Sequence, residues 1–71
     1  MSNQERIDRL SHGERKLYEL LRSQAISTES NANLGITLGL SQWTVSRHLA
    51  LLQALDLVRV EGASNNRVIY A

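Results

Sequence analysis

Cysteine is absent from this 71-residue sequence, so the chain can have no disulfide framework, no thiolate metal site and no thiol nucleophile. Histidine is scarce, because only His12 and His48 occur and they lie far apart in the chain. Two such residues cannot by themselves complete a tetrahedral zinc site. We therefore expect an intracellular protein that binds no metal and no cofactor.

Long apolar runs are also absent. No run approaches the roughly 20 residues of a membrane span, and the opening "MSNQERIDRL" lacks the apolar core of a signal peptide. Carboxylate pairs, nucleophile–base arrangements and phosphate-cradling glycine loops are missing as well. These absences predict a cytoplasmic protein that has no membrane partner, is not an enzyme and contains no catalytic residues.

Charge is nearly balanced, with a formal net charge of +1, which argues against a purely electrostatic binder of nucleic acid. Its distribution is more informative than its sum. Residues 30–55 contain one charged side chain, Arg47, and no acidic residue. A surface built from this stretch can approach a polyanion without first neutralising carboxylates.

The stretch "SHGE" at 11–14 matches a capping box and predicts the start of the first long helix. In this motif the side chains of Ser11 and Glu14 each accept a hydrogen bond from the backbone N–H of the other residue. A helix is predicted over about 12–24. Its buried face is expected to carry Leu17, Tyr18, Leu20 and Leu21. Residues 1–10 are polar and read as an arm or a short extra helix ahead of a single domain at 11–71.

Two further helices are predicted on either side of Gly39. The first covers about 30–38, with Leu34 and Leu38 facing inward. Gly39 ends it in a left-handed turn, Leu40 plugs the turn, and Ser41 caps the next helix over about 42–55. On that helix Val45, Leu49 and Leu52 fall within about 60° of one another and define its buried side.

A β-hairpin is predicted to follow. "LVRVE" at 57–61 alternates apolar and polar residues, "GASNN" is a turn cluster, and "RVIYA" at 67–71 is strand-like again. The expected fold is mainly α with a small β-hairpin, three helices plus a two-stranded wing. Helix, glycine turn, helix and hairpin in this order indicate a winged helix-turn-helix domain.

The stretch "LGLSQWTVSRHLALLQALDLVRV" resembles the winged helix-turn-helix domains of bacterial transcriptional regulators, including the arsenic-repressor-like group. The resemblance runs from about Leu34 to Val60, and the hairpin continues it. It implies that the third helix reads DNA, that the wing touches phosphate or the minor groove, and that the protein dimerises on two half-sites. It does not extend to metal sensing, because the cysteine or clustered histidine and acidic ligands of metal-sensing members are missing.

Two positions depart from the pattern of that family. Gly35 replaces the usual alanine in the second helix, and Asp56 occupies a position where glycine is common. Aspartate tolerates a left-handed backbone less well than glycine does.

The face of the third helix opposite its buried side carries the candidate site. Trp43 lies about 160° around the helix from Val45, and Arg47 lies about 40° from Trp43, one turn further along. Arg47 is the candidate for guanine, Gln42 for adenine or phosphate, and Trp43 for a thymine methyl or sugar. The predicted DNA-binding residues are Ser41, Gln42, Trp43, Thr44, Ser46 and Arg47 from this helix, with Arg59, Asn65, Asn66 and Arg67 from the wing.

The expected function is sequence-specific binding of double-stranded DNA, as a transcriptional repressor or regulator or as the DNA-binding domain of a plasmid- or phage-type control protein. Because few cations are available, a monomer should bind weakly. A homodimer or several copies on repeated or palindromic half-sites would supply the missing affinity. The alternative is a protein-interaction module of the same fold that uses the Trp43 face for another protein.

Overall fold

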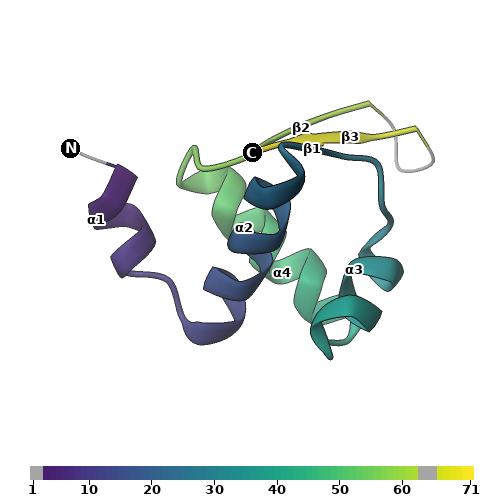
Figure 1. The fold of residues 1–71 in the computed structure, drawn as a ribbon, viewed down its shortest axis with the longest axis horizontal. Helices are drawn as coiled ribbons and strands as arrows, with labels where there is room; N and C mark the ends of the chain where they lie inside the picture. The colour runs from purple at the N-terminus through teal and green to yellow at the C-terminus, as the bar shows by residue number, and fades with distance from the viewer. Residues whose placement is uncertain (1–2, 63–65) are drawn as a thin grey trace.

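A computed structural model describes residues 3–62 and 66–71. Within these residues the chain is mainly helical and has a small antiparallel sheet (Figure 1). The elements in order are α1 (Asn3–Asp8), α2 (His12–Gln24), β1 (Ile26–Ser27), α3 (Asn31–Leu38), α4 (Gln42–Ala54), β2 (Arg59–Glu61) and β3 (Val68–Tyr70). The expected three helices and two strands omit the strand β1, and of the two readings of residues 1–10, an arm or a short extra helix, the structure has the helix α1.

The segment expected as an arm or a short helix contains α1, which is held against the rest of the chain. Arg6 Nη1 donates a hydrogen bond to the carbonyl oxygen of Leu55 (3.2 Å), and Arg15 Nη2 donates one to the carbonyl oxygen of Ile7 (3.2 Å). Leu10 is buried and Ile7 packs against the core. Residues 3–10 thus belong to the folded unit.

The sheet has the strand order β1-β3-β2. Ile26 pairs with Tyr70 and Ser27 with Ile69, so the short β1 closes one side of β3. Arg59, Val60 and Glu61 pair with Tyr70, Ile69 and Val68 on the other side. A two-residue strand shows no alternation, so no sequence pattern indicates β1.

The core lies between the helices and the inner face of the sheet. Its fully buried side chains are Leu17, Leu21, Leu34, Val45, Leu52 and Ile69. The predicted inward sides of α2, α3 and α4 are confirmed, including Tyr18 and Leu49. Leu20, Leu38 and Leu40 pack at its edge and are only partly buried.

The serine caps predicted at Ser11 and Ser41 are confirmed, and a third serine caps α3. Ser11 Oγ accepts from the backbone N of Glu14 (3.4 Å), whose Oε1 accepts from the backbone N of Ser11 (2.9 Å). Ser30 caps α3 and Ser41 caps α4 through their side-chain oxygens. Each cap satisfies a donor that a helix N-terminus would leave without a partner.

The turn between α3 and α4 depends on two glycines. Gly39 has φ 72° and ψ 31°, the left-handed conformation predicted for it. Gly35 is buried, and a Cβ built on it would collide with the carbonyl oxygen of Leu40. Leu40 N donates to the carbonyl oxygen of Gly35 (2.8 Å), so the turn folds back directly onto α3. Gly35 therefore permits this close approach in addition to weakening the helix.

The end of α4 is a Schellman motif with aspartate at the left-handed position. Asp56 has φ 58°. Its N–H donates to Gln53 O (3.0 Å), and the N–H of Leu57 donates to Leu52 O (3.0 Å). Leu52 and Leu57 are both buried, which completes the apolar contact usual in this motif.

We predict that Asp56→Gly stabilises the domain by about 1 kcal/mol, because glycine adopts this backbone conformation without the strain caused by a Cβ. Thermal or urea unfolding followed by circular dichroism measures the change. Asp56→Ala is the matched control, since it removes the same charge near the helix C-terminus but keeps a Cβ. Equal stabilisation by both variants would show that charge, and not backbone strain, sets the effect.

Candidate functional site

The side chains that helical periodicity places on the outward side of α4 are exposed in the structure. Trp43 is 74% exposed, and Arg47 is also exposed one turn further along. Gln42 and Ser46 flank them and are exposed. We call Gln42, Trp43, Ser46 and Arg47 the α4 outer face. A tryptophan this exposed contributes little to the core and is available to a partner.

Ser41 and Thr44 serve chiefly to start α4. Ser41 Oγ accepts from Thr44 N (3.1 Å), and its hydroxyl donates to Thr44 Oγ1 (3.0 Å). Ser41 is exposed and Thr44 is half-buried. The two predicted site residues thus lie beside the α4 outer face, where they fix the first turn of the helix.

Asn31 belongs to the candidate site, although no sequence pattern predicted it there. A hollow of about 260 Å³ is lined by Asn31, Gln42, Trp43 and Ser46. Asn31 is the first residue of α3, directly after the cap Ser30, so its only sequence signal is that of a helix start. The packing of α3 against α4 brings it to the α4 outer face.

A second hollow, of about 310 Å³, lies on the other side of Arg47 and is lined by Glu14, Thr44, Arg47 and His48. Glu14 Oε2 lies 3.8 Å from His48 Nδ1, and both side chains are mostly buried. A Cβ on Gly13 would lie 2.9 Å from His48 Nε2, so the glycine lets α2 approach α4 closely. Residues 30–55 contain no acidic residue, but the packing of α2 on α4 places the carboxylate of Glu14 beside Arg47 and His48.

The two described arginines of the β2–β3 hairpin are engaged within the chain. Arg59 Nε lies 3.4 Å from Glu61 Oε1, and the Arg59 guanidinium lies 4.8 Å from the centre of the Tyr70 ring. Arg67 Nη2 donates to Glu29 O (3.0 Å) and to Asn31 Oδ1 (2.6 Å). Burial lowers the pKa of Arg67, although a guanidinium remains charged at neutral pH.

The hydrogen bonds of Arg67 connect the β2–β3 hairpin to the start of α3, beside the α4 outer face. Arg67, at the turn end of the hairpin, donates to Asn31, and Asn31 in turn lines the hollow beside Trp43. The α4 outer face and the hairpin therefore meet at Asn31. Asn66 is exposed next to Arg67, whereas the predicted Asn65 lies outside the described residues.

Comparisons with models of known protein families, with curated proteins and with solved structures found no match. In the described part of the chain, no three histidine, aspartate or glutamate side chains come together as a possible metal site. None of its helices has the length and apolarity needed to cross a bilayer. The function must therefore be inferred from the site itself.

Proposed function

We propose that the chain is a winged helix-turn-helix domain that binds double-stranded DNA in a sequence-specific manner, with α4 in the major groove and the β2–β3 hairpin as the wing. The observation that carries this proposal is the joint exposure of Trp43 and Arg47 on one side of a capped helix. No acidic residue of α3 or α4 adjoins that side. A major groove accepts a single helix with such a face.

Each residue of the α4 outer face has a role in this proposal. Arg47 donates two parallel hydrogen bonds to O6 and N7 of guanine, the pairing that suits a guanidinium best. Gln42 reaches adenine or a phosphate near the start of the helix, and Ser46 a phosphate or base edge. Trp43 packs on a thymine methyl or a sugar, or braces Arg47 by stacking.

The wing plays a secondary part. Arg59, Asn65 and Asn66 are its candidates for contact with the flanking backbone or minor groove. Arg67 acts by holding the wing against α3, because its guanidinium already donates to Glu29 and Asn31. With so few free cations, a transcriptional repressor or regulator of this design needs a dimer or several copies on repeated or palindromic half-sites.

A fluorescence-anisotropy titration tests the proposal, with DNA from the region upstream of the protein's own coding sequence and a shuffled duplex of equal composition as control. We expect tighter binding to the upstream DNA and a shallow salt dependence. Arg59 is the described arginine proposed to contact the DNA backbone, so the slope of log K against log salt should be about −1 per monomer. Absence of binding, or equal affinity for the two duplexes, contradicts sequence-specific recognition.

A protein-interaction module is the second candidate, favoured by one observation. Trp43 is the largest apolar side chain of the molecule and is 74% exposed, and large exposed apolar groups mark protein interfaces as well. Such a module binds its partner with little dependence on salt between about 50 and 200 mM, whereas DNA binding weakens over that range.

A further inference from the structure

β2 is an edge strand. In the strand order β1-β3-β2 it pairs with β3 on one side, and no strand among residues 3–62 and 66–71 pairs with its other side. An edge of this kind presents backbone N–H and carbonyl groups that can pair with another strand.

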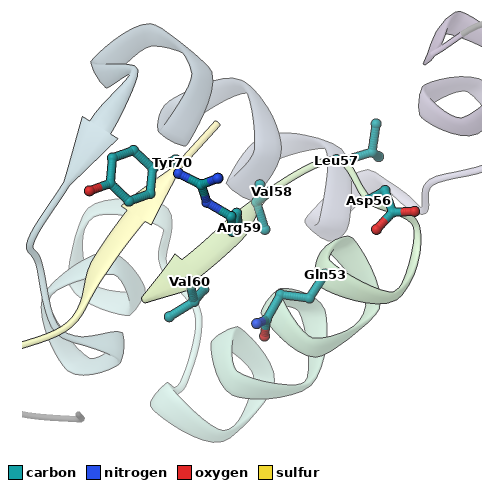
Figure 2. Close-up of a pocket in the computed structure, with 7 residues that line it drawn as sticks. All are labelled: Gln53, Asp56, Leu57, Val58, Arg59, Val60 and Tyr70. Atoms are coloured by element: carbon teal, nitrogen blue, oxygen red, sulfur yellow. The ribbon is translucent and has the colours of Figure 1, made fainter. Parts of the chain in front are cut away.

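Open space lies beside β2. A hollow of about 470 Å³ is lined by Gln53, Asp56, Leu57, Val58, Arg59, Val60 and Tyr70. Figure 2 shows Gln53 from α4 and Val60 from β2 bordering this hollow. An added strand would therefore meet room and apolar surface next to β2.

The charges on β2 are arranged symmetrically about Val60. Arg59 and Glu61 point to the outer face of the sheet and lie 3.4 Å apart at their charged atoms, and both are largely exposed. Val60 points to the opposite face and packs against the core. Charged side chains, lysine above all, commonly protect an edge strand against pairing, but a strand that carries both signs can pair with a copy that places the opposite charge against each.

From this pattern we propose that β2 pairs with β2 of a second copy of this chain, antiparallel and centred on Val60. In that register Arg59 of each copy lies opposite Glu61 of the other on the same face of the sheet, at the distance where opposite charges attract. Two three-stranded sheets become one continuous sheet with a two-fold axis through the paired Val60 residues.

Other registers are unfavourable for a physical reason. Centring the pair on Arg59 or on Glu61 places two like charges directly opposite each other, which destabilises a strand pair. A shift by one residue places the outer face of one copy beside the core face of the other. Charge and side-chain alternation together therefore select the Val60-centred pairing.

The association needs no DNA, so its test is independent of the proposed function. Sedimentation velocity at protein concentrations up to about 1 mM measures it, since an interface of three residues per copy is small and weak. We expect the unaltered chain to dimerise. Arg59→Glu and Glu61→Arg each place like charges opposite one another and should weaken dimerisation at least tenfold.

Two combinations restore the opposite charges. The double variant R59E/E61R should dimerise as the unaltered chain does, and an equimolar mixture of R59E and E61R should form a heterodimer. Arg9→Glu, on an exposed residue after α1, is the control with the same net charge as R59E. Circular dichroism confirms that each variant is folded. A chain that stays monomeric throughout, single variants that dimerise unchanged, or failure of the double variant and the mixture to associate would each overturn the proposal.

Discussion

Leu52→Ala is expected to remove most of the stability of the domain. Leu52 is fully buried on α4, and its carbonyl oxygen accepts the hydrogen bond from Leu57 that ends the helix. Truncation of a buried leucine costs about 3–5 kcal/mol, because the lost transfer free energy is increased by the cavity left behind. A chain of this length has on the order of 4–10 kcal/mol in total. We expect the melting temperature to fall by about 15 °C or more.

The neighbouring residue supplies the control. Leu51 is 37% exposed, so Leu51→Ala removes the same atoms from the same helix and should cost less than about 1 kcal/mol. Thermal and urea unfolding measure the stability lost in each variant. A much larger loss for Leu52→Ala than for Leu51→Ala shows that α4 turns Leu52, and not Leu51, into the core. Similar losses for both would mean that α4 is rotated from the orientation in the structure, and with it Trp43 and Arg47.

The parts of the fold that were predicted correctly depend on interactions between residues close in sequence. The caps at Ser11 and Ser41 and the turn at Gly39 involve partners within a few residues. The inward side of α4 follows from a helical repeat that the sequence shows completely. The exposure of Trp43 follows from the same repeat, because a helix has only one side against the core.

The parts that were missed depend on distant residues. β1 exists because Ile26 and Ser27 pair with residues more than 40 positions later, and two residues carry no pattern of their own. Arg67 reads as a DNA-contacting wing residue until the fold brings Glu29 and Asn31 to it. Glu14 likewise enters the surroundings of Arg47 only through the packing of α2 on α4. Sequence periodicity therefore identified the α4 outer face, but it could not identify its neighbours.

The second prediction with a large expected effect is the loss of specific DNA affinity on substitution of Arg47. We expect Arg47→Ala to weaken binding to the specific DNA by about 1–3 kcal/mol, the value of one good bidentate contact to guanine. Binding to a shuffled duplex should weaken much less, because that complex depends on phosphate contacts alone. Arg47 is exposed and does not belong to the hydrophobic core, so the variant should unfold at the same temperature as the unaltered chain.

Arg47→Lys separates base reading from simple charge. Lysine keeps the positive charge but loses the planar pair of donors that fits guanine. If Arg47 reads a base, R47K should lose nearly as much specific affinity as R47A while it retains the affinity for shuffled DNA. Arg9→Ala, at the end of the molecule that carries α1 (Figure 1), controls for loss of one positive charge and should change neither affinity. If R47A leaves specific affinity unchanged, α4 does not read the sequence through Arg47, and the protein-interaction role of the Trp43 side becomes the better explanation of its exposure.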